Sequence, residues 1–358
     1  HRRPPCGGPT ACLGTRPVTD WRCGEPGAME HYPEPPTIPL ILPTPDVPGD
    51  ADERVRVSRG WYASLAADGP AWERRRRASL ARCAAVLAMT SAQCLSHESA
   101  ALVHGLWIRA QEPDVSVIVR SNPPRTTMPL PPVPGGRSGV SLRRRRVWVT
   151  AEDVVTVSGL RVTSLRRTAL DCAFDLPARE AVCVVDSALR ALCRPSRTGR
   201  RDSERRLSLE LDRLRRAIGA QGPRRGRRRA LAVVAIASGW AESPGESVLR
   251  WFVRAIGLPE PGLQYGIEVP RTGERFFPDL MWPSLRIYLE FDGDLKYQAP
   301  ADLLREKRRR DELARLGWRC VHVTWRDLND LERLRGTILA LFPDDVVRAL
   351  VPVRDLWC

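Results

Sequence analysis

Apolar and polar residues alternate most clearly between Leu285 and Asp292, in the last quarter of the chain. Leucine, isoleucine and phenylalanine occupy one side of this segment, and arginine, tyrosine, glutamate and aspartate occupy the other. A period of two residues predicts a β-strand with one apolar and one polar face. Glu290 and Asp292 would then lie on the same polar face.

A third carboxylate, Asp279, precedes Glu290 by eleven residues and directly follows a proline. This spacing predicts a hairpin whose first strand begins near Asp279 and whose second strand carries Glu290. Carboxylates that lie close together repel one another unless a cation lies between them. Oxygen ligands favour hard ions, so the sequence predicts a site for Mg²⁺ or Mn²⁺. A hairpin with solvated acidic residues is the alternative.

Helical patterns flank this hairpin on both sides. Ser243 has the position of a helix cap, with Glu246 three residues after it, and Gly257 is expected to end that helix. The elements after the hairpin are a charged helix, a strand and a closing helix, over Ala301–Leu316, Cys320–Trp325 and Leu328–Leu341. This order predicts an α/β domain with a mixed sheet flanked by helices.

An α+β domain is predicted upstream, over residues 51–193. Its helices are expected over Glu73–Met89, Ser96–Leu106 and Ala178–Leu192, and its strands over Val115–Val119, Val140–Leu142 and Val147–Val149. His97 and His104 are seven residues apart on one helix face, but no further metal ligand has a suitable spacing. We therefore expect these histidines to make packing or polar contacts.

Three segments lack a clear pattern of folded elements. Residues 1–50 mix proline, glycine and arginine, which predicts a disordered lead-in with Met29 as a candidate start of translation. Residues 194–229 contain fourteen arginines against four acidic residues, which predicts an arginine-rich linker with one helix inside it. Residues 346–358 are expected to be a C-terminal tail.

Positive charge dominates the whole chain, which has a formal net charge of +15. This excess favours a polyanionic partner, and DNA comes before a membrane because no strongly amphipathic basic helix is present. The candidates for phosphate contacts are Arg225, Arg227 and Arg228 in the linker and Lys307, Arg308 and Arg309 in the charged helix. The alternatives are a coding bias toward arginine and a solvated linker that binds nothing specific.

The remaining composition excludes several other classes of protein. No apolar run approaches the length of a membrane span, and the ten cysteines include no C-x-x-C pair. Neither a zinc site nor a disulfide framework is therefore predicted, and a reducing cytoplasm is the expected location. The oligomeric state, the target sequence and the choice between DNA and RNA are not predicted.

The C-terminal motifs resemble those of the PD-(D/E)XK nuclease superfamily. The resemblance rests on Pro278-Asp279, on Glu290-Phe-Asp-Gly-Asp-Leu-Lys296, on Glu306-Lys-Arg-Arg-Arg-Asp311 and on Arg319-Cys-Val-His-Val-Thr-Trp325. Residues 240–345 are most similar to an actinobacterial endonuclease-like domain of uncharacterised function that is related to very-short-patch-repair endonucleases. The resemblance implies a restriction-endonuclease-like fold and a Mg²⁺-dependent DNA endonuclease in phage defence or DNA repair. It also implies Glu246, Asp279 and Glu290 as metal ligands.

One position departs from the nuclease pattern. Where the superfamily usually has a lysine two residues after the glutamate, this chain has Asp292. A lysine returns at Lys296, after Gly293, whose backbone permits a sharp turn. The resemblance thus implies catalytic roles for Asp279, Glu290, Asp292 and Lys296, with Lys296 supplying the positive charge beside the phosphate.

The upstream region resembles AbiEi-type antitoxin-like proteins. Arg54-Val-Arg-Val-Ser-Arg-Gly-Trp-Tyr62 is similar to the wing of their winged helix, although the helices that normally precede a wing are not recognisable. Residues 80–193 share the patterns Ser-His-x-Ser-Ala-Ala and Thr-Ser-x-x-Arg-Thr-x-x-Asp with that family. This resemblance implies the alternative function, a non-catalytic DNA-binding regulator of antitoxin type with a degenerate nuclease fold.

Overall fold

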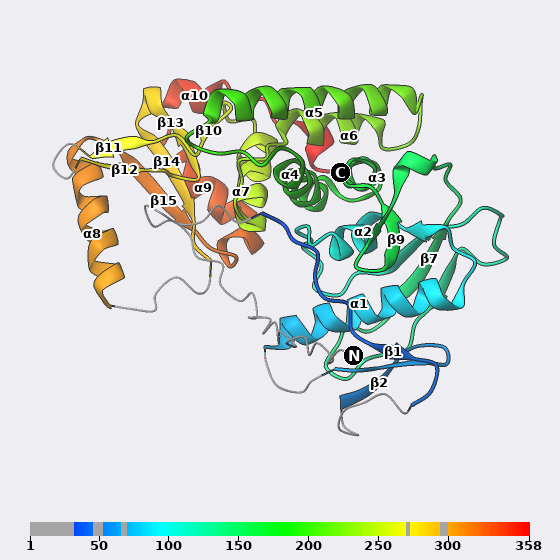
Figure 1. Cartoon of the computed structure of the whole chain (residues 1–358). Helices are drawn as coiled ribbons and strands as arrows, with labels where there is room; N and C mark the ends of the chain where they lie inside the picture. The colour runs from blue at the N-terminus through cyan, green and yellow to red at the C-terminus, as the bar shows by residue number, and fades with distance from the viewer. Residues whose placement is uncertain (1–31, 46–52, 66–69, 270–272, 294–299) are drawn as a thin grey trace, which may run out of the picture.

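The computed structural model describes residues 32–45, 53–65, 70–269, 273–293 and 300–358. Two larger sheets lie on opposite sides of a group of helices that includes α3 (Leu165–Asp175), α4 (Ala178–Cys193) and α7 (Pro244–Ala255), as Figure 1 shows. This arrangement confirms the predicted α/β class. None of the helices in the described ranges combines the length and apolarity that crossing a membrane requires.

The first described elements form a small sheet. Strands β1 (Ile41–Leu42), β2 (Arg54–Ser58) and β3 (Trp61–Ser64) pair in the order β1-β3-β2 and pack against α1 (Ala71–Met89). The segment that resembles a wing is thus a hairpin, and it turns at Gly60, whose positive φ of 72° suits glycine.

Part of the predicted lead-in is ordered. The Tyr32 hydroxyl donates to the Pro195 carbonyl at 3.1 Å, and Ile38 packs against a hydrophobic core. The chain lies so close to Gly105 that a Cβ there would be 1.8 Å from the Glu34 carbonyl oxygen. The predicted disorder therefore does not hold for residues 32–45, because a few apolar residues suffice to attach this segment. The candidate start at Met29 lies outside the described residues.

The six-stranded sheet has the order β6-β7-β5-β4-β9-β8, with parallel pairs β5/β7 and β4/β9. Its strands are β4 (Cys94–Leu95), β5 (Val115–Ile118), β6 (Thr127–Pro129), β7 (Ser141–Arg145), β8 (Val154–Val157) and β9 (Leu160–Thr163). α1 and α2 (His97–Val103) pack on it. Of the two strands predicted over 140–142 and 147–149, the first corresponds to the start of β7, whose arginines continue the pairing with β5, and the second was wrong because residues 147–149 lie beyond the end of β7 and outside any strand.

Helices replace the predicted linker. Over residues 194–229 the chain forms α5 (Arg200–Ala220) and begins α6 (Arg227–Ile236). The buried face of α5 repeats at helical spacing and consists of Ser203, Leu207, Glu210, Leu214 and Ile218. This face packs against α4 and α6, so the helix is part of the core. The linker prediction was wrong because a narrow apolar stripe is enough to dock a highly charged helix.

The C-terminal sheet is mixed, as predicted, and has the order β10-β13-β14-β15. Its strands are β10 (Gly262–Leu263), β13 (Leu280–Trp282), β14 (Ile287–Phe291) and β15 (Arg319–Val323), and β14 and β15 are parallel. One face packs on α7 and α9 (Leu331–Leu339). The other face packs on a hairpin of β11 (Ile267–Val269) and β12 (Glu274–Phe276) and on α8 (Pro300–Arg315).

One continuous hydrophobic core joins the two predicted domains. It also holds the predicted tail, since the Trp251 indole donates to the Leu356 carbonyl at 2.7 Å and the Trp357 indole donates to the Ala255 carbonyl at 3.0 Å. At the junction of α4 and α7, the Arg250 guanidinium pairs with the Asp186 carboxylate. Both side chains are buried, and burial raises the pKa of Asp186.

We expect Asp186→Leu to lower the free energy of unfolding by about 3–5 kcal/mol, because it leaves the Arg250 charge buried without a partner. The double substitution Asp186→Leu with Arg250→Met removes both charges and should recover much of this loss. Thermal and urea unfolding of both variants measure the difference. Equal losses in the single and double variants would contradict this account.

Candidate functional site

The three carboxylates of the predicted hairpin lie on one face of the C-terminal sheet. In the antiparallel pairing of β13 with β14, Leu280 is opposite Leu289, which sets Asp279 opposite Glu290. Alternation along β14 places Asp292 on the same side as Glu290. The Asp279 carboxylate accepts a hydrogen bond of 2.7 Å from the Phe291 backbone N–H. The predicted convergence of the three acidic residues therefore agrees with the strand register.

His322 joins this acidic face from the neighbouring strand. The parallel register of β14 and β15 pairs Glu290 with His322. The His322 Nδ1 atom lies 2.9 Å from Asp292 Oδ2, and its Nε2 atom lies 3.7 Å from Glu290 Oε2. The hydrogen bond with Asp292, together with Cys320 and both carboxylates, raises the pKa of His322 to about 10. At neutral pH a protonated imidazole therefore lies between two carboxylates.

Two further titratable groups continue the network toward α8. Burial raises the pKa of the Tyr288 hydroxyl, and a hydrogen bond with Cys320 raises it further. Burial alone would also raise the pKa of the Cys320 thiol, but hydrogen bonds with His322 and Tyr288 outweigh burial and lower it. The sequence did not predict that Cys320, Tyr288 and His322 lie together, because their proximity depends on which strands pair.

Glu246 lies in the first turn of α7, which packs on the opposite, apolar face of the sheet. Ser243 caps the helix by accepting a hydrogen bond of 3.2 Å from the Glu246 N–H, as predicted. The Glu246 carboxylate in turn accepts a hydrogen bond of 2.8 Å from the Glu242 N–H. Burial, with a contribution from the Glu242 charge, raises the pKa of Glu246 to about 7. These contacts explain Glu246 as part of the helix cap.

The acidic face does not supply a ready set of metal ligands. Within the described ranges, no group of three or more His, Cys, Asp or Glu side chains is placed to hold a metal ion. The Asp279 carboxylate accepts a hydrogen bond from a backbone N–H. The His322 imidazolium supplies a positive charge beside Asp292, the position at which the nuclease superfamily usually has lysine. Lys296 lies outside the described residues. The metal-binding and catalytic roles implied for these residues stay predictions.

We expect His322→Gln to lower the free energy of unfolding by about 1–2 kcal/mol, with the largest effect at about pH 6. The effect is modest because water screens part of the charge interaction. The pKa of His322 is raised above its ordinary value of 6.5, so its contribution is complete below pH 6.5. That contribution should disappear as the pH rises toward 10. Urea unfolding of both proteins between pH 6 and pH 10 measures it, and a difference independent of pH would contradict the assignment.

The candidate phosphate contacts on α8 divide into two kinds. Lys307 and Arg308 are exposed. The Arg309 guanidinium instead lies 4.3 Å from the centroid of the Phe276 ring, so it helps to attach α8 to the β11–β12 hairpin.

The candidate arginines before and within α6 lie at the surface. Arg225, Arg227 and Arg228 are exposed, and the nearest ion-pair contact of Arg228 is Asp355, at 3.6 Å. Because water screens a contact of that length, these three guanidinium groups are accessible to a phosphate backbone.

The two upstream motifs hold the fold together. In Ser-His-x-Ser-Ala-Ala, the His97 Nε2 atom lies 2.8 Å from the Asp175 carboxylate. In Thr-Ser-x-x-Arg-Thr-x-x-Asp, Ser164 caps α3 and the buried Arg167 pairs with Asp171 at 3.0 Å. Burial alone would raise the pKa of Asp175, but its hydrogen bond with His97 and nearby arginines lower it to about 2. The expected polar contact of His97 is confirmed, and the described contacts of both motifs lie within the fold.

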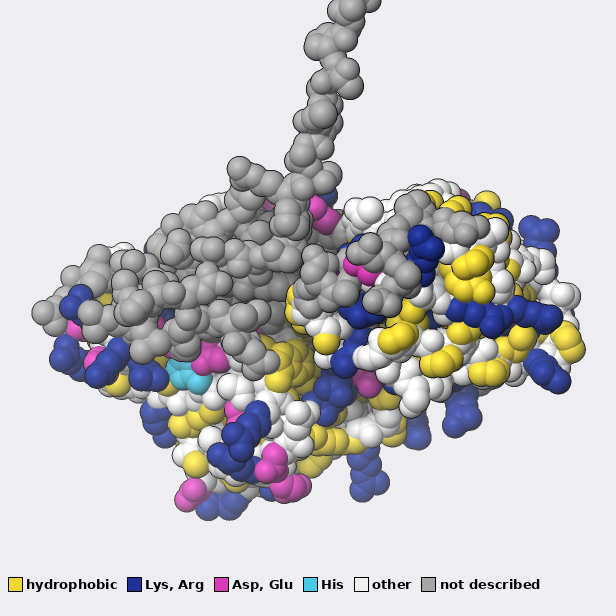
Figure 2. All heavy atoms as spheres, turned by 90° about the horizontal axis from the view of Figure 1, so that it is seen from below, with side chains coloured by type: hydrophobic (Ala, Val, Ile, Leu, Met, Phe, Trp, Pro, Cys, Tyr) yellow, Lys and Arg dark blue, Asp and Glu magenta, His cyan; other side chains and the backbone are white. Residues whose placement is uncertain are grey.

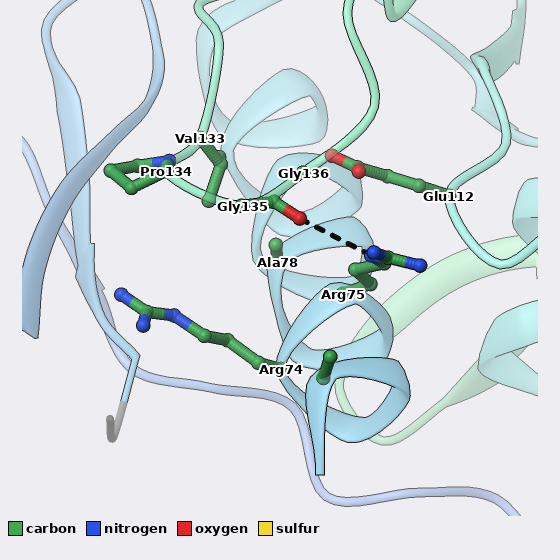
Figure 3. Close-up of a pocket in the computed structure, with 9 residues that line it drawn as sticks. Arg74, Arg75, Ala78, Glu112, Val133, Pro134, Gly135 and Gly136 are labelled. Carbon is green, nitrogen blue, oxygen red and sulfur yellow. Dashed lines mark hydrogen bonds between the residues drawn. The ribbon is translucent and has the colours of Figure 1, made fainter. Parts of the chain in front are cut away.

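A cavity of about 210 Å³ lies between the first turns of α1 and the loop at Val133–Gly136 (Figure 3). Two of its charged groups contact their neighbours: Arg75 donates to the Gly135 carbonyl at 3.3 Å, and the buried Glu112 pairs with the buried Arg82. This cavity contains none of the predicted site residues.

Residues 91–217 match the family described as "AbiEi antitoxin C-terminal domain". The matched stretch includes every strand of the six-stranded sheet, helices α2 to α4 and most of α5. This part of the chain is therefore similar to the C-terminal domain of AbiEi antitoxins, in agreement with the resemblance of its motifs. The match continues past residue 193 and so includes much of the segment predicted as a linker.

Two curated relatives also match, both described as uncharacterized proteins of Mycobacterium tuberculosis, from two strains. Each is 32% identical over 193 residues, which is 54% of this chain and 64% of the relative. The chain thus spans somewhat less than two thirds of the length of these relatives. No solved structure matches the chain.

Proposed function

We propose that this protein is a DNA-binding regulator of antitoxin type. The observation that carries the proposal is the match of residues 91–217 to the AbiEi antitoxin C-terminal domain. The net charge of +15 supports it, because a basic protein is attracted to the phosphate backbone of DNA.

Part of this positive charge lies on one exposed side of α5. On α5 the residues Arg201, Arg205 and Arg216 are exposed, and helical periodicity puts them on one side, away from the buried stripe. A helix of 21 residues is roughly 30 Å long, enough to follow a phosphate backbone over several nucleotides. Figure 2 shows that basic side chains are also widespread on the face seen from below, with fewer acidic ones among them.

Not every arginine contributes to this surface. Arg82, Arg167 and Arg250 are buried in ion pairs with carboxylates, so their charges are neutralised within the fold. A phosphate backbone would meet mainly exposed arginines, and Arg225, Arg227 and Arg228 are exposed and lie close together in the sequence.

We expect the triple substitution Arg225→Gln, Arg227→Gln and Arg228→Gln to weaken binding to duplex DNA. It should also reduce the slope of log K against log salt concentration by about 2–3, roughly 0.9 for each lost phosphate contact. Fluorescence anisotropy with one labelled duplex over a series of salt concentrations measures both quantities.

The matched control removes the same number of positive charges from arginines that pair with carboxylates of their own helices. These are Arg213, Arg215 and Arg315, which contact Glu210, Asp212 and Glu312. The control, with glutamine at all three positions, should bind DNA nearly as the parent does. If both triple variants weaken binding equally, only the net charge matters and these three positions form no specific surface.

A metal-dependent DNA endonuclease is the second candidate function. The observation that favours it is the presence of Asp279, Glu290 and Asp292 on one face of the C-terminal sheet. The His322 imidazolium and the engagement of Asp279 by a backbone N–H oppose it, since both stabilise the acidic face without a metal. Glu246 supports it less than expected, because its contacts belong to the helix cap.

If the acidic face binds Mg²⁺ or Mn²⁺, Asp279→Asn and Glu290→Gln should each abolish binding in isothermal titration calorimetry. Both side chains are partly exposed at the polar edge of the sheet, so we expect the variants to stay folded. Unchanged circular dichroism spectra provide the control. Absence of a binding signal in the parent protein, or full affinity in either variant, would reject the metal site.

A further inference from the structure

One tryptophan in the six-stranded sheet region is almost completely exposed. The Trp148 side chain is 85% exposed, the largest fraction for any large hydrophobic residue in the described part of the chain. It follows β7 and precedes a short turn at Ala151–Asp153. An indole in water forgoes the hydrophobic stabilisation that burial would provide, so its exposure calls for an explanation.

The backbone that carries Trp148 is fixed on both sides. The Trp148 carbonyl accepts a hydrogen bond of 3.0 Å from Arg167, whose buried guanidinium also contacts Asp153 and Asp171. Thr150 and Asp153 then close a reciprocal helix cap. The ring thus extends into solvent from an anchored chain, which lowers the entropic cost of binding a partner there.

Several arginines lie at the edge of the sheet from which the chain leads to Trp148. The parallel register of β5 and β7 pairs Ile118 with Arg145, so the segments that follow the two strands leave the sheet at the same edge. These segments, the adjoining loop and the end of β7 carry Arg120, Arg125, Arg144 and Arg146, of which all but Arg144 are exposed. Contacts of 3.3 Å, from Arg144 to the Arg125 carbonyl and from Arg146 to Asn122, hold the loop against β7.

We propose that Trp148 and these arginines form a binding surface for single-stranded nucleic acid, in which an unpaired base stacks on the indole and the arginines contact the flanking phosphates. Stacking on an exposed aromatic side chain inside a basic surface is the general mode by which proteins bind single strands without base-specific contacts. A duplex is a poorer partner, because its bases are already stacked and must be extruded to reach the ring.

The experiment measures fluorescence anisotropy of labelled oligonucleotides of about twelve nucleotides, as single-stranded DNA, single-stranded RNA and duplex DNA. Trp148→Ala should weaken single-strand binding roughly 5- to 150-fold and leave duplex binding nearly unchanged. Trp148→Phe keeps an aromatic face and should retain most of the affinity. Trp148→Leu keeps an apolar side chain without that face and should behave like Trp148→Ala.

Trp72, which is 43% exposed on α1, provides a matched control. Trp72→Ala should bind single strands as the parent does. The inference is overturned if Trp148→Ala keeps full affinity for both single strands, or if it weakens single-strand and duplex binding equally. It is also overturned if the substitution leaves oligonucleotide binding intact and changes the sedimentation behaviour of the protein, since the tryptophan would then contact another protein copy.

The inference deepens the proposed DNA-binding function but fails or succeeds separately from it. Loss of duplex binding in the Arg225, Arg227 and Arg228 variant tests the proposed function, whereas the difference between Trp148→Phe and Trp148→Leu on single strands tests the stacking surface. A parent protein that binds single strands through Trp148 but no duplex would reject the first and keep the second.

Discussion

The buried ion pair between Asp186 and Arg250 is the interaction on which the relation of the two halves depends. Asp186 belongs to α4, within the stretch that is similar to AbiEi antitoxins, and Arg250 belongs to α7, which packs on the C-terminal sheet. The same two side chains also bind the connecting chain, through the Ser238 N–H and the Ile236 carbonyl. Since each charge is buried, separating the halves would leave both charges without their partner.

Arginine has two distinct uses in this chain, and burial separates them. Arg82, Arg167 and Arg250 bridge elements inside the fold, where a planar guanidinium can donate several hydrogen bonds at once. Arg225 and Arg228 lie at the surface and are accessible to a phosphate backbone. The high arginine content is therefore partly architectural, and net charge alone overstates the charge available to a polyanion.

Local sequence patterns predicted helices and strands well. The candidate site was harder to predict, because it also depends on the pairing of strands that are distant in the sequence. The alternation around Glu290 was sufficient to identify β14 and its polar face, because a period of two is a local property. His322 was missed because its position beside Glu290 depends on the parallel pairing of strands that α8 separates in the sequence. The helix around Leu207 was recognised, but its charge obscured the narrow stripe that buries it. Short strands such as β6 were missed because three residues carry little periodicity.

The motifs that identify the upstream part of the chain stabilise its fold. The surface of this part is formed by other residues. His97, Arg167 and Asp171 are buried, and each is occupied by contacts within the fold. None of them is free to meet a ligand, yet Arg167 holds the backbone of Trp148, the most exposed of the large hydrophobic residues in the described ranges. Two proteins with the same motifs can therefore share this frame and differ in what they bind, because specificity depends on the exposed side chains that the frame supports.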